Sequence, residues 1–246
     1  MGLINSGNIH LFCNTNAALV KGAPKALVLE FPGLGGGSCL GGVTDFCEYD
    51  NIYTRRFAEH GILAAYLFSG PWSWGNKAAV RIADAVVIAI CEKYDMADIP
   101  TVVCGGSMGG LGALIYCADG KANVVACAAA CPCVDAVGSF YALPEFSRTM
   151  LSAVAGYDMP FEQGLESISP LHRLPEMPDI PYRIVCDGDD ALFPPCKITE
   201  YAQKLQNGIK NKVDLIYLAG LGHGGFTDAE REGFHSFIVK NCIKKE

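Results

Sequence analysis

Residues 102–110 read Val102-Val103-Cys104-Gly105-Gly106-Ser107-Met108-Gly109-Gly110. This pattern predicts a short apolar strand, a sharp glycine turn with one serine at its apex, and a helix that begins directly after the turn. The glycines are needed because side chains beside the serine would hold the strand and the helix apart. We therefore expect the Ser107 hydroxyl at a helix N-terminus, where backbone N–H groups and the helix dipole stabilise negative charge.

The composition predicts a single domain, residues 1–246, built around a heavily buried sheet. Half of the 246 residues are apolar and 18% are charged, as is typical of a compact α/β protein. The net charge of −7 argues against nucleic acid and anionic membranes as partners. The 12 cysteines show no C-x-x-C spacing, and the N-terminus lacks a basic and then apolar leader. Both features predict a cytoplasmic protein with free thiols and no metal site.

Apolar strand and helix patterns alternate along the chain. We expect a hairpin at residues 3–12 and strands at 25–31, 62–68, 101–107, 123–129, 182–186 and 213–218. Helical periodicity or helix end signals mark residues 51–60, 77–94, 108–118, 196–207 and 228–242. Because the strands are apolar on both faces, this alternation predicts a mostly parallel sheet of about eight strands with helices on both faces.

A long connection, residues 132–181, separates two of these strands. It exceeds the dozen or so residues that a crossover requires. The segment is rich in aromatic and apolar residues, including Phe140, Phe146 and Met150. We expect a short helical cap over the carboxyl ends of the strands, where α/β sheets bind ligands. A peripheral helical insertion is the alternative.

Candidate partners for Ser107 lie in two loops after later strands. A serine hydroxyl becomes an effective nucleophile when a base takes its proton and a third group orients that base. His223 is the favoured base, because it follows the last predicted strand within the glycine-rich loop Leu221-Gly222-His223-Gly224-Gly225. Three acids follow the preceding strand, and the residues alone leave the choice among Asp187, Asp189 and Asp190 open.

A second glycine-rich loop follows the strand at 25–31 and reads Phe31-Pro32-Gly33-Leu34-Gly35-Gly36-Gly37-Ser38. Its glycines do not fit the dinucleotide fingerprint, because the last position is Ser38. The Gly-Lys-Ser/Thr sequence of a phosphate-binding P-loop is also missing. We therefore do not expect a nucleotide cofactor.

With these motifs in this order, the chain resembles the α/β-hydrolase superfamily over nearly its whole length. The stretch Ser167-Ile168-Ser169-Pro170-Leu171, followed by Pro181 and the strand that leads to the acids, resembles the esterase and prolyl-oligopeptidase-like branch. The dienelactone-hydrolase branch uses a cysteine nucleophile, so Ser107 argues against it. The resemblance implies an α/β-hydrolase fold with no metal and no organic cofactor.

The resemblance also implies a role for each site residue. Ser107 is the expected nucleophile and His223 the expected base. Asp190 is the favoured acid, because Asp190-Ala191-Leu192-Phe193-Pro194 matches the second half of the family pattern G-x-(x)-D-x-x-V-P. The spacing from Gly188 is one residue shorter than in the commonest form of this pattern, so Asp187 and Asp189 remain alternative candidates for the acid. The expected oxyanion-hole donors are the N–H groups of Met108 and Leu34, with Gly35 as the alternative to Leu34.

The implied function is a serine esterase that hydrolyses a small-molecule carboxylic ester through an acyl-enzyme. Small or medium acyl groups are expected, including acetyl or aryl esters on carbohydrate. The aromatic loop with Trp72 and Trp74 could stack on a sugar or aromatic group, although such residues more often serve only in packing. The alternatives are a prolyl-oligopeptidase-like peptidase or amidase, an acyltransferase, and a non-catalytic binding protein with the same fold. The sequence leaves the oligomeric state open.

Overall fold

The computed structural model of the protein describes residues 3–41, 48–96 and 98–243. Its strands form one sheet in the order β1-β3-β2-β4-β5-β6-β7. The bounds of these strands are β1 Cys13–Thr15, β2 Ala26–Phe31, β3 Ile62–Leu67, β4 Thr101–Gly106, β5 Val124–Ala130, β6 Tyr182–Asp187 and β7 Val213–Leu218. The edge strand β1 is antiparallel to β3, and the other pairs are parallel. The prediction of a mostly parallel sheet is confirmed.

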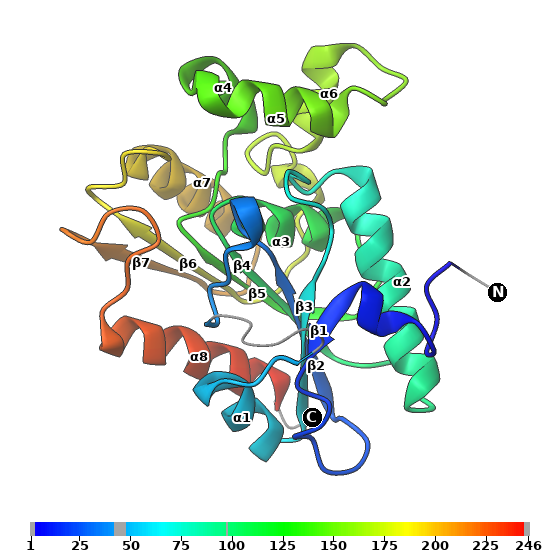
Figure 1. The fold of residues 1–246 in the computed structure, drawn as a ribbon. Helices are drawn as coiled ribbons and strands as arrows, with labels where there is room; N and C mark the ends of the chain where they lie inside the picture. The colour runs from blue at the N-terminus through cyan, green and yellow to red at the C-terminus, as the bar shows by residue number, and fades with distance from the viewer. Residues whose placement is uncertain (1–2, 42–47, 97, 244–246) are drawn as a thin grey trace.

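Helices cover both faces of this sheet, as predicted (Figure 1). The helices are α1 Ile52–Glu59, α2 Lys77–Lys93, α3 Met108–Asp119, α4 Ala136–Ala142, α5 Pro144–Val154, α6 Phe161–Ser167, α7 Pro195–Gly208 and α8 Asp228–Cys242. Short 3-10 turns lie at η1 Ile9–Leu11, η2 Leu34–Gly36 and η3 Leu174–Glu176. No helix in the described residues has the length and apolar character needed to cross a membrane.

The two faces of the sheet bury separate apolar clusters. Val28 of β2 and Val102 of β4 pack with α1 and α8, whereas Leu29 and Val103 face α2, α3 and α7. Neighbouring strand residues thus point into opposite layers, which explains why the strands are apolar at nearly every position. The cysteines among the described residues carry free thiols, and most of them are buried as small apolar side chains.

The described residues form seven strands rather than about eight, because the hairpin predicted at residues 3–12 does not form. The side chain of Asn5 accepts a hydrogen bond from the Gly7 N–H (2.9 Å), and that of Asn8 accepts one from the Asn5 N–H (2.8 Å). These asparagines close a local turn, so the backbone groups are not available for strand pairing. The chain joins the sheet later, at Cys13.

The long connection 132–181 forms α4, α5, α6 and η3. In Figure 1 these three α-helices lie together at one end of the molecule, above α3 and α7. Phe140 and Phe161 join α4 to α6, with their ring centroids 5.0 Å apart. The connection is therefore a small helical unit with its own aromatic contacts.

A buried histidine lies between α8 and α1. The His235 side chain is fully buried, and its ring stacks on Tyr53 with the centroids 3.5 Å apart. Neither ring nitrogen has a hydrogen-bond partner among the described residues. Burial disfavours the imidazolium and lowers the pKa of His235 from 6.5 to about 4.

We expect the free energy of unfolding to decrease as the pH falls from 6.5 to about 4. The unfolded chain protonates His235 near the ordinary pKa, whereas the folded chain resists protonation, so added protons favour unfolding. The difference between the pKa of 6.5 in the unfolded chain and about 4 in the folded chain corresponds to about 3 kcal/mol of unfolding free energy. Urea unfolding at several pH values, in the wild type and in His235→Phe, measures it. The variant keeps a stacked ring without a titrating nitrogen. If its unfolding free energy depended on pH as steeply as that of the wild type, His235 would not be the titrating group.

Candidate active site

The serine predicted at the apex of the turn lies between β4 and α3. Ser107 has φ 58° and ψ −125°, a backbone conformation that residues with side chains rarely adopt. Its N–H donates to the carbonyl oxygen of Ala130 at 2.8 Å, which ties the turn to the end of β5. The strained turn therefore holds Ser107 in a defined place at the carboxyl edge of the sheet.

The first and last glycines of the turn are required by close backbone contacts. A Cβ on Gly109 would lie 2.1 Å from the carbonyl oxygen of Phe31, and one on Gly105 would lie 2.3 Å from the carbonyl oxygen of Gly109. Both distances are far below van der Waals contact. At Gly106 the nearest atom would be the Cβ of Cys39, at a tolerable 3.3 Å.

A continuous chain of hydrogen bonds connects the serine to an acid. The Nε2 of His223 lies 2.9 Å from the Ser107 Oγ, and its Nδ1 lies 2.8 Å from the Asp190 Oδ2. The histidine comes from the loop between β7 and α8, and the aspartate from the loop between β6 and α7. An imidazole that donates from Nδ1 to a carboxylate presents Nε2 as an acceptor for the serine proton.

Asp190 is held as a carboxylate. Its Oδ1 accepts the N–H groups of Leu192 at 2.8 Å and Phe193 at 3.0 Å. Burial by itself would raise the pKa of Asp190, but the hydrogen bonds from His223, Phe193 and Leu192 outweigh that effect and hold the pKa below its ordinary value. The ring of Phe193 also meets the His223 ring edge to face, with centroids 5.3 Å apart.

The other two aspartates bind the backbone of the histidine loop instead of the imidazole. Asp187, which is fully buried, accepts the N–H groups of Leu221 and Gly222, each at 3.1 Å. Asp189 accepts the Gly220 N–H at 2.6 Å. The structure thus separates the three acids, among which the family pattern favoured Asp190: Asp190 contacts the ring, and its neighbours hold the loop in place.

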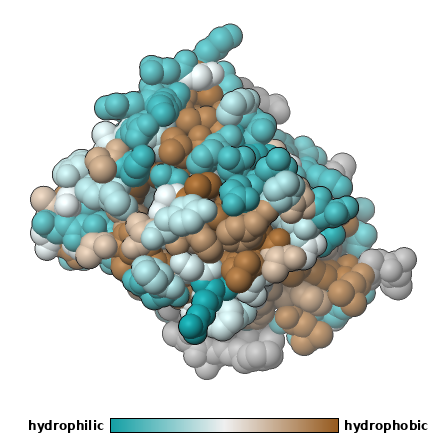
Figure 2. Space-filling model, turned by 90° about the horizontal axis from the view of Figure 1, so that it is seen from above, coloured by the Kyte–Doolittle hydropathy of each residue, from teal (hydrophilic) through white to brown (hydrophobic). Residues whose placement is uncertain are grey.

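Ser107 and His223 face a pocket of about 320 Å³. Its walls come from the glycine-rich loop after β2, from α5 through Phe146, and from the segment around the start of α8. Viewed from the side on which α4–α6 lie, hydrophobic surface alternates with hydrophilic patches (Figure 2). A pocket of this size is at the lower end of the range for small-molecule sites.

The expected oxyanion donors lie at the start of two helical turns. Met108 is the first residue of α3, so its N–H has no acceptor within the helix. Leu34 begins η2 and lines the pocket together with Ser107. Gly35, the alternative donor, is not among the described lining residues.

A buried acid that the sequence analysis overlooked supports the glycine-rich loop. The Glu30 carboxylate lies in β2 and accepts the Ser38 hydroxyl at 2.8 Å, the Cys39 N–H at 2.6 Å and the Tyr49 hydroxyl. Burial raises the pKa of Glu30, although these hydrogen bonds oppose the change. One acid within the otherwise apolar strand Ala26–Phe31 is the signal that could have identified it, because buried carboxylates need partners.

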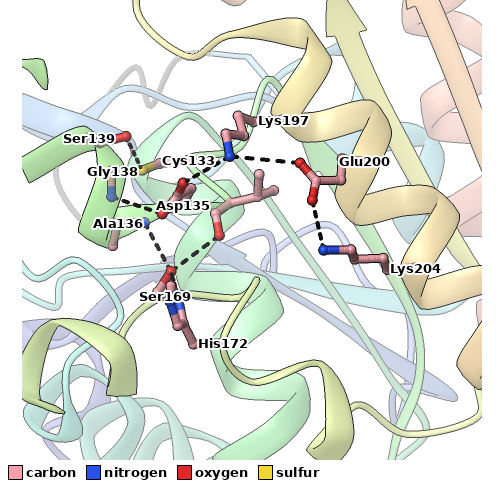
Figure 3. A network of polar contacts seen from close by, with 11 residues as sticks. Cys133, Asp135, Ala136, Gly138, Ser139, Ser169, His172, Lys197, Glu200 and Lys204 are labelled. Atoms are coloured by element: carbon pink, nitrogen blue, oxygen red, sulfur yellow. Dashed lines mark hydrogen bonds and ion pairs between the residues drawn. The ribbon is translucent and has the colours of Figure 1, made fainter.

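Figure 3 shows the polar contacts that anchor the base of α4. Asp135 accepts the Gly138 N–H at 2.8 Å and lies 3.7 Å from the Lys197 Nζ of α7. The buried Ser169 hydroxyl accepts the Ala136 N–H at 3.1 Å and contacts the His172 Nδ1 at 2.9 Å. His172 therefore belongs to this supporting network and is not the histidine that contacts Ser107.

The two tryptophans of the aromatic loop have different environments. Trp74 is 1% exposed, and its Nε1 donates to the Thr149 Oγ1 of α5 at 2.9 Å. Trp74 therefore has the packing role that is common for such residues, against α5, and does not offer a face for stacking on a sugar. Trp72 is 51% exposed but lies outside the described lining of the pocket.

One group of possible metal ligands coincides with the hydrogen-bonded chain. Ligand atoms of Cys131, Asp190 and His223 lie within 4.8 Å of one another. Burial raises the pKa of Cys131 to about 11, so the thiol stays protonated at neutral pH. Both histidine nitrogens already have partners in Asp190 and Ser107. These features fit the hydrogen-bonded chain from Asp190 through His223 to Ser107 better than a metal site.

Comparison with solved structures identifies the fold. A puromycin hydrolase superposes with a TM-score of 0.68 at 18% identity over 92% of this chain. An acylaminoacyl peptidase gives 0.67 at 14% identity over 92% of the chain, and a truncated carbohydrate esterase from gut microbiota gives 0.65 at 16% identity over 91%. These likenesses show that the chain has the α/β-hydrolase fold.

The lengths of these proteins differ. The chain spans 35% of the puromycin hydrolase, 38% of the acylaminoacyl peptidase and 88% of the truncated esterase. No model of a known protein family matches the chain, and no curated protein matches it.

We expect Gly109→Ala and Gly105→Ala to destabilise the protein by about 3 kcal/mol or more, because each new methyl group would collide with fixed backbone. Gly106→Ala is the matched control and should cost about 1 kcal/mol, since its neighbour is a side chain that can shift. Thermal or urea unfolding measures the three variants. Equal stability of all three would refute the close-contact argument.

Proposed function

We propose that this chain is a serine hydrolase that cleaves carboxylic esters of small or medium acyl groups. The observation that carries the proposal is the unbroken hydrogen-bond chain from Asp190 through His223 to the Ser107 Oγ, which opens on a pocket of about 320 Å³. The α/β-hydrolase fold supports it, because this fold carries such a group at the carboxyl edge of its sheet.

In the first step, the Ser107 Oγ attacks the ester carbonyl while the His223 Nε2 takes the hydroxyl proton. The Asp190 carboxylate stabilises the imidazolium that forms. The N–H groups of Leu34 and Met108 are the proposed donors to the oxyanion of the tetrahedral intermediate. When this intermediate collapses, the bond to the alcohol oxygen breaks and His223 gives its proton to the leaving alcohol.

In the second step, water attacks the acyl-Ser107 carbonyl and His223 takes a proton from that water. The second tetrahedral intermediate releases the carboxylic acid, and the proton returns to the Ser107 oxygen. Ester and water are thus converted to acid and alcohol with no other reactant. If an alcohol entered in place of water, the same residues would perform acyl transfer.

We also propose that residues 132–181 act as a cap on this pocket. Phe146 of α5 lies in the pocket wall, and Trp74 contacts it with the ring centroids 5.7 Å apart. A wall of this kind limits the size of the acyl or alcohol group and excludes water from part of the site. Small and medium acyl groups fit a pocket of about 320 Å³.

A peptidase is the second candidate, because the puromycin hydrolase and the acylaminoacyl peptidase share the fold. This chain spans about a third of each of those proteins. The same three residues could cleave an amide, so substrate tests must separate the two activities. The likeness to the carbohydrate esterase supports esters on carbohydrate as one class of substrate for the proposed esterase.

We expect Ser107→Ala to lower kcat for 4-nitrophenyl acetate by roughly 10³- to 10⁶-fold without unfolding the protein, because it removes the hydroxyl that is hydrogen-bonded to His223. Ser152→Ala removes an exposed hydroxyl from α5 and is the matched control. Fluorophosphonate labelling should disappear only in Ser107→Ala. Near-normal turnover by that variant would rule out the nucleophile, and cleavage of proline-containing peptides without ester turnover would favour the peptidase.

We expect Asp190→Asn to reduce kcat by roughly 10²- to 10⁴-fold, because the amide would no longer orient and stabilise the protonated imidazole. Asp189→Asn provides the comparison, since that exposed side chain holds one N–H of the loop and does not touch the ring. It should change kcat by less than about tenfold. Steady-state kinetics of the two variants shows which acid acts on His223. A larger loss of kcat in Asp189→Asn than in Asp190→Asn would make Asp189 that acid.

A further inference from the structure

One charged side chain enters the pocket beside Ser107. Arg231, in the first turn of α8, lies in the pocket wall a few residues after His223. It is the one permanently charged residue among the described residues that line this pocket. The ester hydrolysis proposed above gives it no role.

The guanidinium of Arg231 is oriented by an aromatic ring. Its central carbon lies 5.2 Å from the ring centroid of Phe226, over the ring face, and Phe226 lines the same pocket. A guanidinium held over an aromatic ring keeps its N–H donors for other partners, because the attraction comes from its charge and not from a conventional hydrogen bond. The arginine is thus positioned before any substrate arrives, which reduces the entropy lost on binding.

No acidic side chain neutralises Arg231 within the described residues. Some arginines have such partners, since Arg55 pairs with Asp50 and Arg173 pairs with Asp119. Among the described residues Arg81 and Arg148 also lack one, but neither of them lines this pocket. The ion pairs found in the described part of the chain include none with Arg231. A half-buried arginine without an acidic partner, in a pocket that the apolar Phe146 and Leu192 also line, favours an anion that comes from outside the protein.

The negative net charge of the chain gives weight to a positively charged side chain in the pocket. The chain has a net charge of −7, so its long-range field does not attract anions. An anionic substrate would therefore need a specific positive group within the pocket. One planar guanidinium matches one carboxylate, with two parallel N–H···O bonds.

We propose that Arg231 determines specificity for esters that carry a free carboxylate, in the acyl group or in the alcohol. The inference rests on the proposed ester hydrolysis and names its substrate class. Arg231 binds the carboxylate while Ser107, on the same pocket, attacks the ester carbonyl. The substrate is thus held at two points, and its ester group is presented in a fixed orientation.

Two pairs of model esters test the proposal, each differing only in charge. The acyl-side pair is the 4-nitrophenyl monoester of adipic acid and the same ester with its free acid converted to the carboxamide. The alcohol-side pair is 3-carboxyphenyl acetate and 3-carbamoylphenyl acetate. We expect the wild type to prefer the carboxylate in at least one pair by about 10- to 100-fold in kcat/KM, as for one charge-assisted pair of hydrogen bonds.

Arg231→Met should bring this kcat/KM ratio close to one, because it keeps an apolar stem but removes the charge. Arg231→Lys should keep part of the preference, since the charge remains without the planar fork. Arg81→Met, which removes an exposed arginine of α2 outside the pocket lining, is the matched control and should leave the ratio unchanged. A ratio that is the same in the wild type and in Arg231→Met overturns the proposal, as does the lack of any carboxylate preference in the wild type.

Binding to the Ser107→Ala protein separates this proposal from the proposed reaction. Calorimetry with 3-carboxyphenyl acetate and with the adipate monoester should show tighter binding than for the carboxamide partner in at least one of the two pairs, and adding Arg231→Met should abolish the difference. If no ester is hydrolysed but this difference is found, the hydrolysis fails and the carboxylate site stands. If esters are hydrolysed through Ser107 but neither binding nor kcat/KM depends on Arg231, the reaction stands and the carboxylate site is refuted.

Discussion

The close contact between the start of α3 and the ends of β2 and β4 is the constraint on which the candidate site depends. The position of a Cβ on Gly109 is 2.1 Å from the Phe31 carbonyl oxygen, so the helix reaches the sheet only with glycine there. This approach forces Ser107 into its strained conformation and brings it next to the loop that follows β2. The proposed nucleophile, Ser107, and the proposed oxyanion donor, Leu34, thus line one pocket through backbone packing.

Parallel strands then bring the remaining groups to the same edge. The loops after β6 and β7 lie side by side because these strands pair in register from Tyr182 with Val213 to Asp187 with Leu218. Two acids of the first loop bind the backbone of the second, and the third acid binds the His223 ring. The imidazole orientation is therefore determined by several carboxylate–backbone hydrogen bonds, in addition to its own bond to Asp190.

A buried carboxylate performs a comparable task on the opposite side of the serine. Glu30 binds Ser38 and Cys39 of the glycine-rich loop from within β2. A loop with this many glycines has high conformational entropy, so fixed acceptors at its end restrict it. The hydrogen bonds that the acid accepts offset part of the cost of burying it, and the loop gains a defined path past Ser107.

The sequence by itself determined the parallel sheet with helices on both faces, the turn around Ser107, and the order of serine, acid and histidine. These features depend on local periodicity and glycine placement, which short segments carry. Tertiary structure alone decided that Asp190 meets the imidazole, that Trp74 is buried, that residues 3–12 do not form a hairpin, and that Arg231 enters the pocket. The reason is physical, because such features depend on which atoms from distant segments come within hydrogen-bonding or packing distance, and sequence spacing does not encode those distances.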